Sequence, residues 1–189
     1  MKKTDLDILI GKAKEFHGEI CPGIIIGVRI AVLGMEYLDM NVSKKNKDLI
    51  VFVEVDRCIS DAIQSVTGCS LGHRTLKPVD YGKLGATFLD ITNNKAVRIS
   101  AIAMPPENLD EIEMNSLLKR VSESPDEELF KLQKVKLILS ETDSPGPPSN
   151  ITTCSKCSER IIDHREIISN GKTFCQACAG EAYYKVEDD

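Results

Sequence analysis

Residues 22–38 read PGIIIGVRIAVLGMEYL, a stretch that is apolar on nearly every side. Pro22 suits the first position of a helix, because its missing N–H would have no partner there. A helix that is hydrophobic all round does not face solvent. This stretch therefore predicts a helix that is buried within the domain or at a subunit interface.

The segments around this helix predict both helices and strands. Apolar residues at helical spacing predict further helices at 5–16, 58–66, 109–121 and 126–139. Runs rich in apolar and β-branched residues predict strands at 49–55, 86–91 and 97–103. Asn93-Asn94 can form a hairpin turn between the last two strands. Because helices and strands follow one another in mixed order, we predict an α+β core domain.

A linker separates this core from the end of the chain. Residues 141–150 read ETDSPGPPSN, and the run Pro-Gly-Pro-Pro within them interrupts regular structure. We therefore predict a core domain at 1–140, a linker at 141–150 and a small C-terminal zinc domain at 151–189. A chain of 189 residues is long enough for one full domain and such an appendage.

Four cysteines in the last domain have the spacing of a zinc site. Cys154 and Cys157 form one Cys-x2-Cys pair, and Cys175 and Cys178 form a second pair after seventeen residues. Each pair can place two thiolates on one Zn2+ from a tight knuckle. Asn170-Gly171 is a strong hairpin signal between the pairs, and residues 179–186 favour a short terminal helix. This order of elements predicts a treble-clef zinc finger.

The predicted zinc is structural, since four thiolates leave no open coordination position. So small a segment has too little core to fold without its metal. His164 could replace one of the cysteines as a ligand, although it lies in the middle of the predicted hairpin. Residues 154–189 hold five Lys or Arg against seven Asp or Glu. This balance argues against phosphate binding and favours contact with a protein.

Three cysteines belong to the core domain, and two of them lie at predicted helix starts. Cys21 precedes the helix at 22–38, and Cys58 follows a strand and opens the next helix. Backbone N–H groups at a helix N-terminus favour a thiolate, which would lower the thiol pKa and raise the affinity for metal. His17 lies four residues before Cys21, and Cys69 lies at the far end of the second helix. We predict His17, Cys21 and Cys58 as catalytic or metal-binding residues, with Cys69 as a further candidate ligand.

The same residues permit a plainer interpretation. Free cysteines are among the most buried residue types, and a single histidine is usually a satisfied polar group. Asp61 and Gln64 favour the functional interpretation, because they add polar groups on roughly one side of the helix that begins at Cys58. We therefore predict a second divalent metal, bound in the core domain.

Several motifs resemble those of a known family. The stretch FHGEICPG at 16–23 is similar to the FHGHxCPG signature of the FmdE family, which takes its name from the E subunit of formylmethanofuran dehydrogenase. Further similar stretches follow in the family's order: EVDRC at 54–58, DAIQ at 61–64, TGCS at 67–70 and DYGK at 80–83. The resemblance covers about residues 10–105. Several members of that family also carry a C-terminal treble-clef zinc finger.

The resemblance implies an α+β core, an intertwined homodimer and a His/Cys metal or active site, which falls on His17, Cys21 and Cys58. Glu19 stands where the family has a second histidine. A carboxylate is a harder ligand than imidazole and would change the preferred metal. The parent enzyme reduces CO2 on a molybdenum or tungsten pterin that other subunits hold, so the resemblance implies an accessory protein of that dehydrogenase. The alternatives are a stand-alone thiol- or metal-dependent enzyme and a metal-sensing interaction module.

The bulk composition narrows the range of partners. The formal net charge of −5 provides no general attraction for nucleic acid or anionic membranes. The N-terminus carries charges within its apolar run and does not resemble a signal peptide. The longest apolar stretch, 24–35, is interrupted by Arg29 and falls short of the roughly 20 residues that span a bilayer. We therefore expect a cytoplasmic protein without nucleic-acid or membrane partners, and cysteines that are not in disulfides.

Overall fold

A computed structural model describes residues 3–42, 44, 46–102, 109–140 and 143–187. The chain divides into two compact units, Met1–Leu137 and Ile138–Asp189. Parts of the sequence predictions lie outside the described residues. These are residues 1–2, 43, 45 and 103–108 of the predicted core domain (with Ala103 of the predicted strand at 97–103), Glu141-Thr142 of the predicted linker, and the last two residues of the predicted zinc domain.

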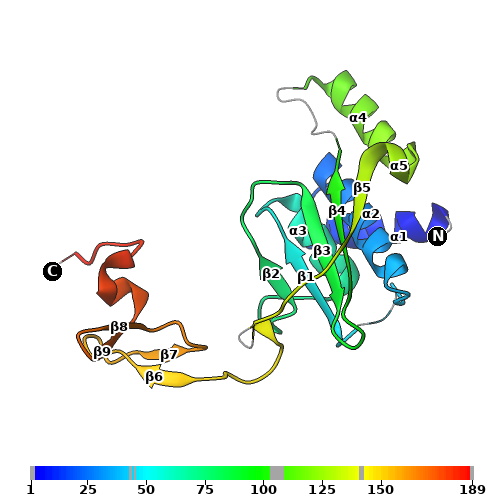
Figure 1. Ribbon diagram of the computed structural model, residues 1–189. Helices are drawn as coiled ribbons and strands as arrows, with labels where there is room; N and C mark the ends of the chain where they lie inside the picture. The colour runs from blue at the N-terminus through cyan, green and yellow to red at the C-terminus, as the bar shows by residue number, and fades with distance from the viewer. Residues whose placement is uncertain (1–2, 43, 45, 103–108, 141–142, 188–189) are drawn as a thin grey trace. The chain divides into compact units, whose positions relative to one another are not determined.

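The first unit packs one sheet against a layer of helices (Figure 1). The sheet has the order β2-β1-β3-β4-β5, formed by β1 (Leu49–Val53), β2 (Leu76–Pro78), β3 (Gly85–Asp90), β4 (Lys95–Ala101) and β5 (Phe130–Val135). β1 and β2 run parallel, and the other neighbours run antiparallel. Behind the sheet in Figure 1 lie α1 (Lys3–His17), α2 (Pro22–Tyr37) and α3 (Cys58–Thr67). The predicted α+β class is confirmed.

Helix α2 forms the centre of the helical layer, as its sequence predicted. Twelve of its sixteen residues are buried, and it packs on α3, β3 and β4. Two glycines allow this close packing. A Cβ on Gly27 would lie 2.8 Å from the backbone oxygen of Ile59 in α3, and a Cβ on Gly34 would overlap the ring of Phe88 in β3. The core therefore depends on tight contacts at two glycines, seven residues apart, along one helix.

Arg29 is the one charged residue in the buried stretch of α2, and it binds the last turn of α4 (Glu111–Glu123) and the segment that follows it. Its guanidinium donates to the carbonyl oxygens of Val121 at 2.8 Å and Ser124 at 2.7 Å, and it pairs with Asp126. The charge of Arg29 is therefore compensated. The contact holds the start of α5 (Asp126–Leu129) against the helical layer.

The helix predicted at 126–139 is wrong beyond its first turn. α5 ends at Leu129, and the chain continues as β5 beside β4. Phe130 is only 3% exposed and belongs to the core. The backbone of β5 pairs with the backbone of β4, which would otherwise be an edge strand. Helical spacing in the sequence could not reveal this open sheet edge, which decides the conformation. The strand β2 also escaped prediction, because it has only three residues.

The other elements lie close to their predicted positions. α3 ends at Gly68, which adopts the left-handed conformation with φ of 71°. β3 and β4 form the predicted hairpin. Within the part of the chain that the structure describes, no helix has both the length and the apolar character needed to cross a membrane.

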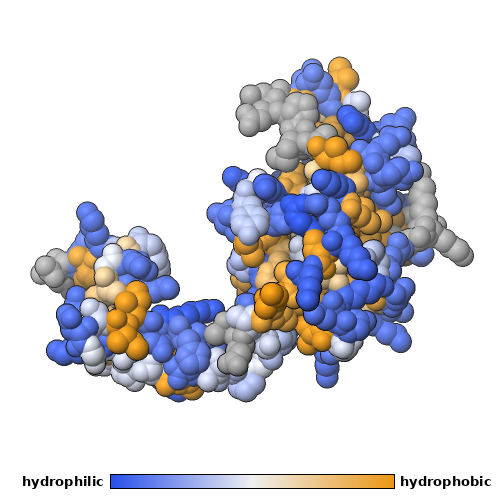
Figure 2. Space-filling model, in the orientation of Figure 1, coloured by the Kyte–Doolittle hydropathy of each residue, from blue (hydrophilic) through white to orange (hydrophobic). Residues whose placement is uncertain are grey.

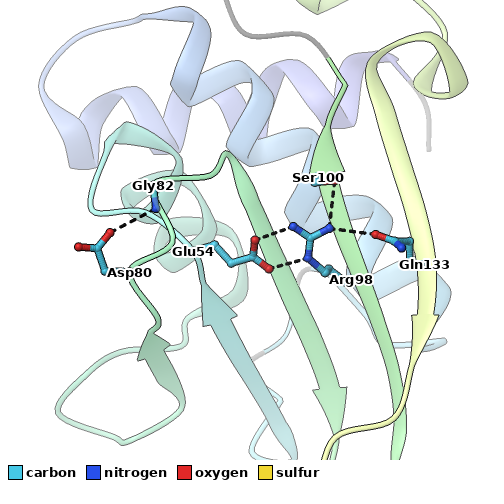
Figure 3. Close-up of polar contacts among 6 residues, drawn as sticks. All are labelled: Glu54, Asp80, Gly82, Arg98, Ser100 and Gln133. Carbon is cyan, nitrogen blue, oxygen red and sulfur yellow. Dashed lines mark hydrogen bonds and ion pairs between the residues drawn. The ribbon is translucent and has the colours of Figure 1, made fainter.

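A buried ion pair ties three strands together on the sheet (Figure 3). Glu54 follows β1 and is 4% exposed. Both of its carboxylate oxygens accept hydrogen bonds from Arg98 of β4 at 2.6 Å, and Arg98 also donates to Gln133 of β5 at 2.9 Å. The backbone oxygen of Glu54 accepts two hydrogen bonds from the loop 80–83. Glu54 therefore links the family-like motif at 54–58 to the motif at 80–83.

The second unit consists of two short hairpins and a helical turn. β6 (Ile151–Thr153) pairs with β7 (Arg160–Ile162), and β8 (Ile167–Ser169) pairs with β9 (Lys172–Phe174). The predicted turn at Asn170-Gly171 connects β8 and β9, and both of its residues have positive φ. The terminal helix predicted at 179–186 is wrong. A short π-helical turn spans Ala177–Glu181, and Gly180 with φ of 110° interrupts it.

Candidate metal centres

The four C-terminal cysteines converge on one point. Their sulfur atoms all lie within 4.8 Å of one another. Cys154 and Cys157 occupy the turn between β6 and β7, whereas Cys175 follows β9 and Cys178 lies in the helical turn. The two hairpins thus bring together two pairs that are far apart in the sequence.

The geometry of this cluster fits Zn2+. A tetrahedral site with Zn–S bonds of about 2.3 Å requires sulfur atoms about 3.8 Å apart. The sulfurs of Cys157 and Cys175 lie 3.9 Å apart. Backbone N–H groups also approach the sulfurs: Cys175 N lies 3.4 Å from Cys154 Sγ, and Cys178 N lies 3.4 Å from Cys175 Sγ. Such N–H groups stabilise the thiolates that a metal needs.

The pKa values of these thiols show why a cation belongs here. Backbone hydrogen bonds from Cys157 and Cys175 lower the pKa of Cys154 to about 6. Burial, followed by contacts with the other three thiols, raises the pKa of Cys178 to about 12. Four adjacent thiolates repel one another, so they cannot all ionise near neutral pH without a compensating charge. A divalent metal supplies that charge.

His164, the alternative ligand, is not part of this group. Its ring contacts Glu166 instead, with Nδ1 3.8 Å from Oε1. Among the described residues, the four cysteines make up the candidate ligand set of the tail.

A second cluster lies in the core unit and contains His17, Cys21 and Cys58. One ligand atom from each residue lies within 4.8 Å of the other two. His17 ends α1, Cys21 caps the N-terminus of α2, and Cys58 is the first residue of α3. All three side chains are half-buried. Residues that are 41 positions apart in the sequence thus meet at the ends of three helices.

Gly23 makes room for the two thiols. A Cβ at this position would lie 3.1 Å from the Cβ of Cys58 and 3.6 Å from the sulfur of Cys21. Any larger residue would therefore press between the two cysteines. The sequence reasoning missed this role, although Gly23 belongs to the motif at 16–23.

Asp61 orients the histidine of this cluster. Its Oδ2 lies 2.8 Å from His17 Nδ1. When Nδ1 carries the proton and donates it to Asp61, Nε2 keeps its lone pair for a metal. A carboxylate bound to a ligand histidine in this way is the common outer-shell arrangement in metal sites. The sequence placed Asp61 near Cys58, but it did not indicate this contact.

The sequence predicted a lowered pKa for Cys21, and this prediction is wrong. Burial raises the pKa of Cys21, and contact with the thiol of Cys58 raises it further. The backbone N–H groups of Ile24 and Gly23 act in the opposite direction, but they do not prevail. In the absence of a metal, the surroundings of Cys21 therefore favour the protonated thiol.

The remaining candidates lie outside the core cluster. Cys69 is 2% exposed at the far end of α3, and its sulfur faces the backbone oxygen of Leu49 at 3.7 Å. Burial raises the pKa of Cys69. Gln64 lies one turn beyond Asp61 on α3. Glu19 is exposed and is not part of the group.

The comparison with known families agrees with this arrangement. The family model described as "FmdE, Molybdenum formylmethanofuran dehydrogenase operon" matches residues 16–142. This match covers more than half of the chain and includes the whole core cluster. The chain belongs to the FmdE family. The resemblance that the motifs indicated is thereby confirmed.

Individual relatives extend the comparison. A curated protein of Archaeoglobus fulgidus, described as "Probable S-adenosyl-L-methionine-binding protein", is 30% identical over 211 residues. The alignment covers 97% of this chain and 56% of the relative, so the FmdE-family chain spans little more than half of that protein's length.

A solved structure supports the fold. The crystal structure of a tungsten formylmethanofuran dehydrogenase FmdE-like protein from Syntrophus aciditrophicus matches with a TM-score of 0.65 and 21% identity, over 95% of both chains. The chain therefore has an FmdE-like fold, and it carries two cysteine-containing clusters that could hold metal ions.

Proposed function

We propose that this FmdE-family protein is an accessory protein whose core unit binds a divalent metal through His17, Cys21 and Cys58. The observation that carries the proposal is the convergence of three ligand atoms within 4.8 Å at the ends of three helices. Three protein ligands leave a position open for a further ligand, which is typical of catalytic zinc sites rather than structural ones. The core site, and not the tail, is where we place the chemistry.

The residues of the core site have distinct tasks in this proposal. Cys21 and Cys58 supply soft thiolate ligands, and Asp61 fixes the tautomer and orientation of His17. A bound divalent metal would act as a Lewis acid at the open position. Glu19 is exposed near the cluster in sequence, and it is not needed to complete the set.

For the second unit we propose a structural zinc in a treble-clef finger, held by Cys154, Cys157, Cys175 and Cys178. The sulfur separation of 3.9 Å supports Zn2+. The order of a knuckle, a hairpin and a second knuckle leading into a helical turn supports the treble clef. We also retain the division into a core domain at 1–140, a linker at 141–150 and the finger at 151–189.

For partners we propose a cytoplasmic homodimer that associates with a molybdenum or tungsten formylmethanofuran dehydrogenase. The family description supports the association. Exposed apolar side chains support self-association: Figure 2 shows several apolar patches on the visible face of the core unit, and Ile102 and Leu132 are 58% and 45% exposed. Purification of the tagged chain at native levels tests this part, which fails if no molybdenum or tungsten enzyme accompanies it.

Metal analysis of matched variants tests the core site. The wild-type chain should carry two metal equivalents, and the Cys58→Ser variant should carry one. Cys69→Ala is the control, because Cys69 is a cysteine just beyond the other end of the same helix and lies outside the cluster. One equivalent in the wild type, or the same loss in both variants, would remove the core metal from the proposal.

Binding of S-adenosyl-L-methionine is a second candidate function. It is favoured by the description of the A. fulgidus relative and by the 97% of this chain that aligns with it. Calorimetric titration of the chain with S-adenosyl-L-methionine tests the candidate. An absence of saturable heat at millimolar ligand would remove this candidate.

A further inference from the structure

A groove of about 570 Å3 lies beside the core metal cluster, between α1 and α3. One side consists of Lys12, Glu15 and Phe16, and the other consists of Gln64, Ser65 and the segment 68–73. Pockets for small ligands commonly have volumes of about 300–1,000 Å3. The groove is thus large enough for a metabolite.

The groove and the metal cluster involve the same two helices, α1 and α3. Phe16 directly precedes the candidate ligand His17. Gln64, Ser65 and Gly68 follow Asp61 at spacings of three, four and seven residues on α3. Residues at these spacings share one face of a helix, and seven residues extend over about 10 Å. The groove therefore begins one residue from His17 on α1 and one helical turn from Asp61 on α3.

The two charged side chains of α1 in the groove, Lys12 and Glu15, have opposite signs. Neither Lys12 nor Glu15 forms an ion pair or side-chain hydrogen bond with a residue of the described ranges. They are three residues apart on one helix, which places their Cβ atoms about 5–6 Å from each other. Such a pair matches a small molecule that carries a carboxylate and an ammonium group close together.

The opposite side of the groove supports the same ligand class. The C-terminal end of α3 at Gly68 carries the negative end of the helix dipole, which favours a cation and disfavours a ligand with anionic charge alone. His73 binds Ser70 Oγ through Nδ1 at 2.7 Å, and its Nε2 has no hydrogen bond to any residue that the structure describes. Nε2 is therefore available to the carboxylate of a ligand.

The groove also has an apolar lining residue, Phe16. Phe16 is 53% exposed, although it is a large aromatic residue. An apolar or aromatic side chain on the ligand would cover this ring and remove its surface from water.

We propose that this groove binds an α-amino acid with an apolar side chain, with its carboxylate at Lys12 and His73 and its ammonium group at Glu15 and the end of α3. The inference deepens the proposed function, because it names the class of ligand that would approach the core metal. It does not require the metal for binding, since every contact comes from the groove itself.

Three related probes test the inference with the full-length chain. L-phenylalanine carries both charges, 3-phenylpropanoate lacks the ammonium group, and 2-phenylethylamine lacks the carboxylate. We expect saturable binding of L-phenylalanine by NMR titration, with amide shifts at 12–16 and 64–73. Each truncated probe should bind about tenfold more weakly or worse, because a lost charge-assisted contact is worth roughly 1.4 kcal/mol or more. Equal binding of the three probes, or no saturable binding of L-phenylalanine at millimolar concentration, would overturn the inference.

Matched variants locate the site. Lys12→Ala should weaken binding of L-phenylalanine by about fivefold or more, whereas Lys14→Ala should not change it, because Lys14 is an exposed lysine of the same helix outside the groove. Equal losses in both variants would contradict the assignment. Cys58→Ser separates this inference from the metal proposal: it should lose the core metal and keep L-phenylalanine binding. If the wild type binds L-phenylalanine but holds no core metal, only the metal proposal fails.

Discussion

The two cysteine clusters use the same side chain in different structural settings. In the C-terminal unit, four cysteines come from two hairpins whose described residues bury few side chains, with Cys154, Ile161 and Asp163 below 9% exposure. In the core unit, two cysteines and a histidine lie at the ends of helices that already pack on a large apolar core. The first cluster has little else to hold its surroundings together, whereas the second lies on a scaffold that hydrophobic packing stabilises. We infer that the tail needs its metal in order to fold, whereas the core folds without its metal.

The largest effect should come from breaking the tail site. Cys175→Ser removes one of four ligands, and structural zinc contributes on the order of 10–16 kcal/mol to such small units. We expect the amide signals of the C-terminal unit to collapse to unfolded positions in the 1H–15N NMR spectrum, while core signals stay in place. Cys58→Ser is the matched change in the core and should leave all folded signals present. Dispersed tail signals in Cys175→Ser would show that the tail folds without its metal.

The core should instead be sensitive to packing. Gly34→Ala places a Cβ within the space of the Phe88 ring, and overpacking of this kind costs about 1–3 kcal/mol or more. Urea unfolding of the core should show this loss. Gly11→Ala is the control, because a Cβ there meets nothing within 4 Å, and replacing a helical glycine by alanine stabilises by about 0.5–1 kcal/mol. Similar stabilities for the two variants would mean that α2 does not organise the core.

A smaller change concerns the affinity of the core metal. Asp61→Asn keeps the size of the side chain but removes the charge that orients His17. Loss of such an outer-shell carboxylate weakens metal binding by about 10–100-fold, which competition with a chromogenic chelator can measure. Asp56→Asn changes an aspartate of the preceding loop and should have no such effect. If both variants bind equally well, Asp61 has no role in the site.

The smallest effect should be the pH dependence of core stability. Burial raises the pKa of Cys69 in the folded state. The neutral thiol therefore makes its full contribution to the stability of the core below the pKa of the unfolded thiol, about 8.5. That contribution is lost as the pH rises through the folded-state value. Cys69→Ala should therefore show a shallower alkaline decline in urea unfolding between about pH 8 and pH 10. If stability declines as steeply in Cys69→Ala as in the wild type, the decline arises from the titration of other groups.

The sequence revealed those features that local patterns control. Hydrophobicity on all sides predicted α2, and regular spacing predicted the four C-terminal cysteines as one group. Asn170-Gly171 predicted its own turn, because the turn conformation depends on those two residues. The α+β class and the family followed from such local patterns and motifs.

Local sequence patterns could not predict the features that depend on tertiary contacts. The strand at Phe130–Val135 forms because β4 offers an open edge, and charged residues at helical spacing concealed it. Likewise, His17, Cys21 and Cys58 were candidates by position. No local pattern specified that Asp61 would contact His17 or that a side chain at Gly23 would crowd the two cysteines. Cys69 was a further candidate ligand because it is a cysteine close to the same helix, and the structure places its sulfur against the backbone of Leu49, outside the cluster.

Stepwise removal of metal from the wild-type chain tests the central comparison most directly. A chelator of increasing strength should be added while released metal is quantified and the amide spectrum is recorded. We predict two metal equivalents, of which the first leaves the three-ligand core site with shifts confined to residues near His17, Cys21 and Cys58. The second should leave the tail together with its folded signals. Unfolding of the core on loss of the first equivalent, or a tail that stays folded without metal, would contradict the account.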